Sequence, residues 1–422
     1  MSSFDRRAWL RLAGIGALGW LAPSLARAET GVRRKPLVVV VQRGALDGLS
    51  WVVPHGDDAY YSARPQLAVP APGRGADACL PLPGGRFGLH PASQPLLALY
   101  LEGRLGFVHA VGTPAATRSH FDAQDVLESG TGGASSRDDG FLNRALRSAA
   151  LHTAAPQAAG TASSAATGSS AATLGAVAIQ SRLPRILRGD ASALAFEKLT
   201  DMRVRGPAAK LVGKTFEEMY AGAVDEALRS SASGAFDADA LLGRVRTRAP
   251  SPRDGVVYPK STLGRRMRQI AQLLQADVGV ELAVTESGGW DTHVDQNGRL
   301  QRGLTDQAQA LRAFLDDLGP LAQEVCLVTV TEFGRTVAQN GSGGTDHGHG
   351  SVMMVAGGGV RGGAVHSRWD GLERDVLFEQ RDLPITIDQR DVFAHVLRQH
   401  WGLGDTSLVL PGFAADPLLA LG

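Results

Sequence analysis

Two short clusters of histidine and aspartate side chains have the composition of a metal site. They are Trp290-Asp291-Thr292-His293 and Thr345-Asp346-His347-Gly348-His349, and each follows an apolar run typical of a buried strand. Carboxylates and imidazoles bind divalent cations, and strand ends are where α/β domains hold their ligands. Asp291 and His293 are two residues apart, as are His347 and His349, so in extended backbone both members of a pair point to one side. Each pair could hold one ion.

Two further segments at expected strand ends carry charged groups suited to a catalytic site. Asp47, in Gln42-Arg43-Gly44-Ala45-Leu46-Asp47-Gly48, could be a metal ligand or an orienting carboxylate, or a solvated residue in an ordinary turn. Arg335, in Glu332-Phe333-Gly334-Arg335, could bind a phosphate or sulfate through its guanidinium, or form a surface ion pair with Glu332. Of the single histidines, we keep His366 and His55 as reserve ligands.

The segment Thr117-Arg118-Ser119-His120-Phe121-Asp122 offers a hydroxyl beside an imidazole. Ser119 could be a nucleophile that His120 or a metal activates. It could equally be the N-cap of a helix that begins at His120, since Asp122 follows three residues later. The two interpretations are compatible, because the dipole of a helix favours negative charge at its N-terminus.

Strands and helices alternate along the chain. Continuous apolar runs rich in β-branched residues predict strands covered on both faces, as in a mainly parallel sheet, at 37–41, 105–111, 174–179, 280–285, 325–330 and 352–356. Helical periodicity falls at 95–102, 141–149, 263–276, 300–318 and 392–401. The pattern predicts an α/β domain with its ligand beyond the carboxyl ends of the strands.

Two stretches interrupt this alternation. Residues 154–173 are nearly all Ala, Ser, Thr, Gly and Pro, a composition that cannot bury a core and predicts a flexible insertion. Residues 191–249 are helical in character and are expected to form either a cap beside the site or a plain structural elaboration.

The N-terminus has the pattern of a twin-arginine export signal. Asp5-Arg6-Arg7-Ala8-Trp9-Leu10-Arg11 is followed by a modest apolar run and by Ala26-Arg27-Ala28, which suits signal peptidase. The apolar run is shorter than the roughly 20 residues that a spanning helix needs. We therefore expect a cleaved signal over residues 1–28, no stable membrane span, and a mature protein exported to the periplasm.

Composition narrows the range of partners. A formal net charge of +1, with basic residues scattered along the chain, argues against nucleic acid or an anionic membrane. Of the two cysteines, Cys326 lies in a buried-strand pattern and Cys79 in a loop, so we expect two unpaired thiols.

Taken together, these motifs resemble an uncharacterised family of twin-arginine-exported bacterial proteins, the domain of unknown function 1501. That family is grouped with the alkaline phosphatase-like and sulfatase-like superfamily. The resemblance implies one α/β/α sandwich over residues 29–422, with a mainly parallel sheet and a helical insertion. It also implies divalent ions beside a nucleophile, to which Ser119 is the nearest match.

The ligands carried over by this resemblance are Asp291 with His293 and Asp346 with His347. Gln42 and Arg43 stand where the superfamily has an Asp after the first strand, with Asp47 a few residues later. This departure leaves open whether the site holds two ions, one or none. The expected cofactor is a divalent metal ion, and Zn, Mg, Mn and Ca all remain open.

Two functions follow from this resemblance. One is an exported metal-dependent hydrolase of phosphate or sulfate esters, whose partners are a small anionic ester and the twin-arginine export machinery. The other is a non-catalytic envelope protein that keeps the fold and binds or assembles with another envelope protein.

Overall fold

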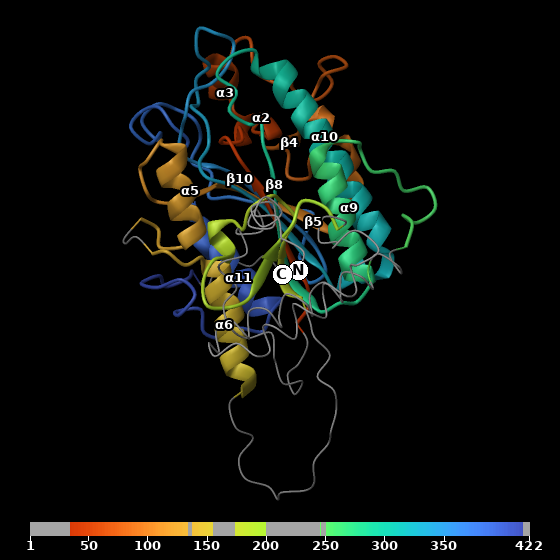
Figure 1. Cartoon of the computed structure of the whole chain (residues 1–422). Helices are drawn as coiled ribbons and strands as arrows, with labels where there is room; N and C mark the ends of the chain where they lie inside the picture. Colours follow the sequence, from red (N-terminus) through yellow and green to blue (C-terminus); the bar gives the residue numbers. More distant parts are fainter. Residues whose placement is uncertain (1–33, 134–136, 155–173, 200–244, 246–249, 417–422) are drawn as a thin grey trace, which may run out of the picture.

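The centre of the molecule is a mixed, mainly parallel sheet (Figure 1). The computed structural model describes residues 34–133, 137–154, 174–199, 245 and 250–416. Within them the strand order is β11-β5-β10-β9-β1-β8-β6-β7, and β12 also pairs with β5. The strands are β1 (Leu37–Gln42), β5 (Leu105–Gly112), β6 (Gly175–Ala178), β7 (Ala193–Ala195), β8 (Val280–Ser287), β9 (Cys326–Thr331), β10 (Ser351–Gly357), β11 (Val365–His366) and β12 (Ile387–Asp388).

Strand direction decides where the loops gather. β1 pairs in parallel with both β8 and β9, so Gln42 lies opposite Ser287 on one side and Thr331 on the other. β10 runs antiparallel to β9 and β5, which makes β5 parallel to β1. The carboxyl ends of β1, β5, β8 and β9 therefore share one edge with the start of β10.

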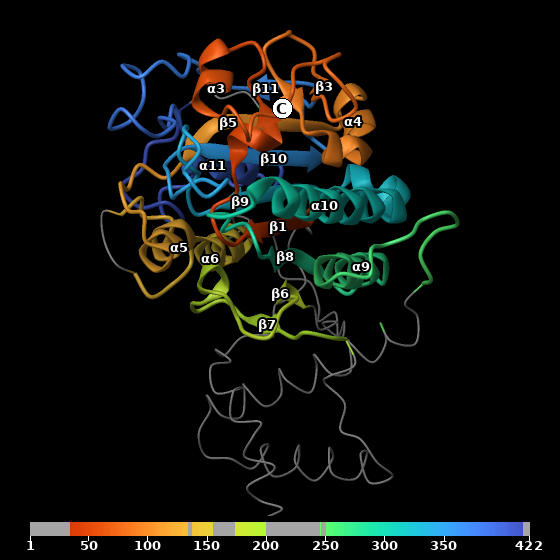
Figure 2. The same ribbon diagram turned by 90° about the horizontal axis from the view of Figure 1, so that it is seen from above.

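Helices cover both faces of the sheet, as the view from above shows (Figure 2). Val38 and Val40 of β1 belong to the core cluster shared with α4 (Gln94–Leu101), α9 (Thr262–Gln275) and α10 (Gln296–Leu318). Leu37, Val39 and Val41 point to the opposite cluster, with α5 (His120–Ser129), α6 (Phe141–Ala154) and α11 (Gln389–Gln399). β1 is buried on both faces for this reason, which explains its unbroken apolar sequence.

Smaller elements complete the described residues. A second sheet has the order β2-β4-β3, formed by β2 (Val52–Val53), β4 (Gly88–Leu89) and β3 (Leu80–Pro81). The short helices are α2 (Gly48–Trp51), α3 (Asp58–Ala63), η2 (Pro91–Ser93), η3 (Arg185–Leu187) and η4 (Gly319–Gln323).

The expected α/β class and mainly parallel sheet are confirmed. Both cysteines are free and buried. The segment 191–249 begins differently from the helical expectation, because Ala193–Ala195 forms β7 beside β6; residues 200–244 and 246–249 lie outside the described residues. So do the expected signal at 1–28 and residues 155–173 of the expected insertion. In the described part of the chain, no helix combines the length and apolar character needed to cross a bilayer.

Candidate metal centre

Four loops meet at the carboxyl edge of the sheet. Asp291 and His293 follow β8, Glu332 follows β9, His120 is the first residue of α5 after β5, and His347 lies in the loop that enters β10. The topology places all four loops at one edge. The structure thus brings the two sequence clusters together, as the strand pattern predicts.

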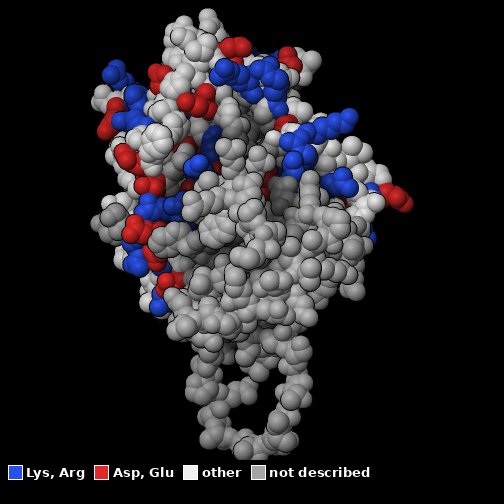
Figure 3. Space-filling view, viewed as in Figure 1, with Lys and Arg blue, Asp and Glu red and all other residues white. Residues whose placement is uncertain are grey.

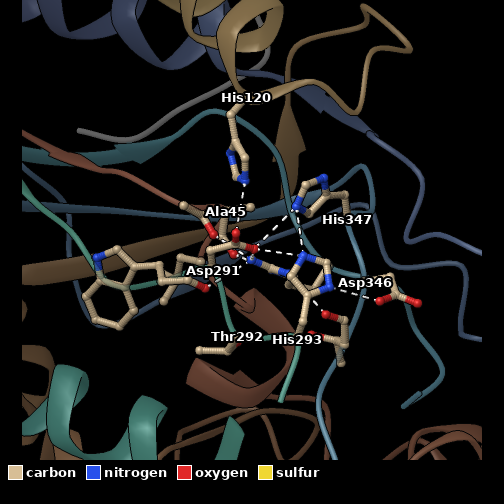
Figure 4. A network of polar contacts seen from close by, with 12 residues as sticks. Ala45, His120, Asp291, Thr292, His293, Asp346 and His347 are labelled. Carbon is tan, nitrogen blue, oxygen red and sulfur yellow. Dashed lines mark hydrogen bonds and ion pairs between the residues drawn. The ribbon is translucent and has the colours of Figure 1, made fainter. Parts of the chain in front are cut away.

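Asp291 is the hub of this group (Figure 4). Its Oδ1 lies 2.9 Å from His293 Nε2 and 3.3 Å from His347 Nε2, and its Oδ2 lies 3.6 Å from His120 Nε2. The two nitrogens His293 Nε2 and His347 Nε2 are 3.0 Å apart. Ligand atoms of His120, Asp291 and His347 lie within 4.8 Å of one another, a spacing that could hold a metal ion. We call His120, Asp291, His293 and His347 the donor group.

Each imidazole of the donor group is held from behind through its other nitrogen. Nδ1 of His120 is 2.9 Å from a carboxylate oxygen of Glu332, and Nδ1 of His293 is 2.9 Å from a carboxylate oxygen of Asp346. Nδ1 of His347 is 2.8 Å from the carbonyl oxygen of Arg118. Acceptors of this kind fix the tautomer and orientation of metal-binding histidines.

Asp346 therefore supports His293 from outside the donor group, although the resemblance makes it a ligand. Its Oδ1 accepts from Asn340 as well as contacting His293 Nδ1. The hydrogen bond with His293 lowers the pKa of Asp346, so this carboxylate is ionised at neutral pH.

Arg335 has a structural role instead of the predicted role as a substrate clamp. Its side chain is buried, and its guanidinium donates to Asp291 Oδ1 and to the carbonyl oxygens of Gly44, Ala45, Trp290 and Thr345. It binds the loops after β1 and β8 to each other and orients Asp291. Burial alone would raise the pKa of Asp291, but its hydrogen bond and ion pair with Arg335 lower that pKa to about 2.

Backbone packing around Asp291 requires a glycine at position 44. Gly44 has φ +112°, and a Cβ there would lie 2.6 Å from the backbone nitrogen of Asp291. Its N–H donates to Glu332 Oε1, the same carboxylate oxygen that contacts His120. Glu332 is fully buried, and this hydrogen bonding outweighs desolvation and lowers its pKa.

Asp47 is a correction to the predicted ligand set. Its carboxylate is buried and forms an ion pair with Arg64, at 2.7 and 3.1 Å, and it also accepts from Gln296 Nε2 at 2.6 Å. Both oxygens are thus occupied by donors within the protein. The carboxylate is neither solvated nor part of the donor group; it joins α10 to the segment after β1.

His349 is a second correction, because it does not share a site with His347. Residues 345–350 are not a strand: only His347 forms a bridge, opposite Arg335, and the backbone bends at His349. A Cβ on the intervening Gly348 would lie 2.3 Å from the carbonyl carbon of Arg335, so the loop packs directly on that residue. The ring of His349 stacks on Phe378 with centroids 4.3 Å apart.

Ser119 is the N-cap of α5, as the capping interpretation predicts. Its hydroxyl oxygen accepts from the backbone N–H of Asp122 at 3.5 Å, and the residue is exposed. The adjacent His120 faces Asp291 and stacks on Phe333. The reserve ligands are elsewhere: His366 lies in β11 and His55 follows β2.

A cluster of ion pairs that holds His347, here called the ionic clamp, was not apparent from the sequence. Asp382 is fully buried and accepts hydrogen bonds from both Arg118 and Arg381. The carbonyl oxygen of Arg118 accepts from His347 Nδ1, and Arg381 donates to the carbonyl oxygen of His347. These residues lie more than 30 positions from His347, so only the fold could reveal them.

Charges on the face seen in Figure 3 are mixed in sign. Basic and acidic side chains alternate over the described part of this face, with no broad field of one sign.

Fold and site define an α/β protein with a mainly parallel sheet and a candidate metal centre at its carboxyl edge. The chain belongs to a family of proteins of unknown function, DUF1501, whose model matches residues 84–412. This match includes every residue of the donor group. A search of curated proteins gave no match.

Proposed function

We propose that this protein is an exported, metal-dependent hydrolase of phosphate or sulfate esters. The observation that supports this most is the convergence of three imidazole Nε2 atoms on the carboxylate of Asp291. The side chain of Asp291 is 46% exposed, so a substrate can reach these donors. The superfamily likeness of the sequence motifs supports the reaction class.

The chain's own residues suit this chemistry. A divalent ion bound there would polarise an ester oxygen and offset the charge that develops on it. Ser119 would supply the attacking hydroxyl, since it precedes His120 at the N-terminus of α5, where the helix dipole favours negative charge. The Ser119 oxygen accepts a hydrogen bond of 3.5 Å from the N–H of Asp122, so turning the hydroxyl toward an ester would cost no more than the N-cap contribution of about 1 kcal/mol. Arg335 would keep Asp291 in place.

The test is hydrolysis by the mature protein, assayed with 4-nitrophenyl phosphate, bis(4-nitrophenyl) phosphate and 4-nitrophenyl sulfate. His347→Ala should remove turnover and lower the amount of bound metal. His366→Ala, a histidine change outside the donor group, is the matched control and should keep both. A metal-loaded wild-type protein inactive on all three esters would refute this proposal.

A second candidate is a non-catalytic envelope protein that binds or assembles with another envelope protein. One observation favours it: the side chain of Arg335, the predicted substrate clamp, is buried and donates to loop carbonyl oxygens instead. Retained metal without turnover would support this alternative.

Export by the twin-arginine route is part of both candidates and is tested separately. Replacing Arg6 and Arg7 by lysine should leave the precursor in the cytoplasm. Periplasmic appearance of that variant at the wild-type level would show that another route is used.

A further inference from the structure

The outer hydrogen bonds of the donor group determine where its protons are. Carbonyl and ionised carboxylate oxygens only accept hydrogen bonds, so Nδ1 of each imidazole must carry the hydrogen. This holds for His120 against Glu332, His293 against Asp346 and His347 against Arg118. In a neutral imidazole the remaining nitrogen, Nε2, then presents a lone pair. Three lone pairs and one carboxylate consequently face one another.

Such an arrangement is suited to binding a cation. His293 Nε2 and His347 Nε2 are 3.0 Å apart, and with Nδ1 carrying the hydrogen on each ring, a metal ion between them would use both lone pairs. Nε2 of His120 is buried and lacks a hydrogen-bond partner in the described structure. Ligands at about 2.0–2.2 Å from a tetrahedrally coordinated ion are roughly 3.3–3.6 Å from each other. The separations of 2.9–3.6 Å around Asp291 are close to that spacing.

Among the described residues, the carboxylates nearest the donor group already have partners within the protein. Glu332 and Asp346 are committed to His120 and His293, and Asp47 is committed to Arg64 and Gln296. Among the described residues, the group of three or more donors with metal-binding spacing is the one at Asp291. A paired-ion site would need further oxygen ligands at this edge.

We propose that the donor group binds a single borderline transition-metal ion of the zinc class, through Nε2 of the three histidines and the carboxylate of Asp291. Imidazole suits Zn²⁺ and its first-row neighbours, whereas Mg²⁺ and Ca²⁺ require mainly oxygen ligands. This proposal deepens the proposed function, because it names the metal and gives one ion per chain. It rests on the proposed function only for the use of that ion in hydrolysis. A lone ion cannot clamp the entering and leaving oxygens as a pair of ions does.

Metal titration of the full mature chain tests this inference without any substrate. Protein stripped with a chelator is titrated calorimetrically with Zn²⁺, Co²⁺, Mg²⁺ and Ca²⁺, and elemental analysis gives the stoichiometry. We expect one Zn²⁺ per chain and at least about 100-fold weaker binding of Mg²⁺ and Ca²⁺. The visible spectrum of the Co²⁺ form should show nitrogen-rich coordination of low symmetry.

Variants separate the donor group from its surroundings. His293→Ala removes a ligand and should lower Zn²⁺ affinity more than Asp346→Asn does. Asp346→Asn should lower it about 10–100-fold with the stoichiometry unchanged. Asp254→Asn, an exposed carboxylate change elsewhere, is the control and should bind like wild type. Circular dichroism of each variant checks that it is folded. Equal affinity of Asp346→Asn and wild type would overturn the assignment of His293.

The outcomes distinguish this inference from the proposed function. Two ions per chain, or Mg²⁺ bound as tightly as Zn²⁺, would overturn the inference while leaving hydrolysis possible. One bound Zn²⁺ per chain without turnover would support the single-ion site and refute the hydrolase function. A folded wild-type chain that binds no Zn²⁺ would overturn both.

Discussion

Replacing Asp47 by asparagine should destabilise the protein strongly and leave its metal in place. Both carboxylate oxygens of Asp47 are acceptors: Oδ1 from Arg64, and Oδ2 from Arg64 and Gln296. An asparagine can offer one acceptor oxygen, and in either amide orientation its NH₂ group meets a donor. The guanidinium of Arg64, fully buried, would lose its counter-charge.

The decrease in the free energy of unfolding can be estimated from the burial of this ion pair. Removing one partner of a buried ion pair costs roughly 3–5 kcal/mol, because the other charge stays buried and uncompensated. Arg64 keeps its hydrogen bonds to Ser50 and to the carbonyl oxygens of Thr336 and Val337. One Asn oxygen also remains as an acceptor. We therefore expect about 3 kcal/mol, the lower end of the range.

The same pair predicts a pH dependence. Burial alone would raise the pKa of Asp47, but the charge and hydrogen bonds of Arg64 lower it below its ordinary value. A carboxyl whose folded pKa is depressed stabilises the native state above its unfolded pKa of about 3.9 and loses that contribution as the pH falls through the folded pKa. Wild-type stability should therefore fall below about pH 4, and the pH dependence of Asp47→Asn should lack this component.

Urea unfolding followed by tryptophan fluorescence, together with elemental analysis, measures both effects. Asp254→Asn is the control, because it removes an exposed carboxylate. A stable Asp47→Asn protein that has lost its metal would show that Asp47 is a ligand and would refute this account of the pair.

Three further predictions concern the support of the donor group. Ser119→Ala should lower the free energy of unfolding by about 1 kcal/mol through loss of the N-cap, and complete loss of hydrolysis in that variant would identify the nucleophile, whereas unchanged turnover would exclude it. Asp382→Asn should loosen the clamp on His347 and weaken Zn²⁺ binding about 10–100-fold, as calorimetry can measure; unchanged affinity would disprove the clamp. Gly44→Ala should reduce both stability and metal affinity, because its Cβ would displace the backbone of Asp291; a variant indistinguishable from wild type in both would contradict this packing.

Much of the central sheet is predictable from the sequence because its buried strands are long, continuous apolar runs. Strands buried on both faces must be apolar throughout, so the run 37–41 identifies β1 without reference to any partner. β8 and β9 are mainly apolar with a few polar residues, and their apolar runs also identify them as strands. The small sheet β2-β4-β3 has two-residue strands, too short for any alternation to register. β7 has three residues inside a stretch whose composition is helical, and its pairing with β6 comes from the fold.

The site was predictable where chain direction alone decides proximity. Asp291 and the loop of His347 lie at the predicted edge because topology brings strand ends together. The direction in which a loop side chain points could not be predicted in this way. His347 and His349 would share a side in extended backbone, but the loop packs on Arg335 and bends. Sequence spacing also cannot show that Asp47 forms an ion pair with the buried Arg64, which follows the last residue of α3.

The short motif Glu332-Phe333-Gly334-Arg335 shows why residue type alone misassigns such groups. Its acid and base resemble catalytic side chains, yet both are buried and both face the protein. Glu332 holds His120 and the N–H of Gly44, while Arg335 holds Asp291 and the loop carbonyls, so the two opposite charges fix the two ends of the donor group. Burial is affordable for these charges because every strong contact is a charge-assisted hydrogen bond. Ligand geometry at this edge therefore depends on Glu332 and Arg335, from the segment after β9, as much as on the ligands themselves.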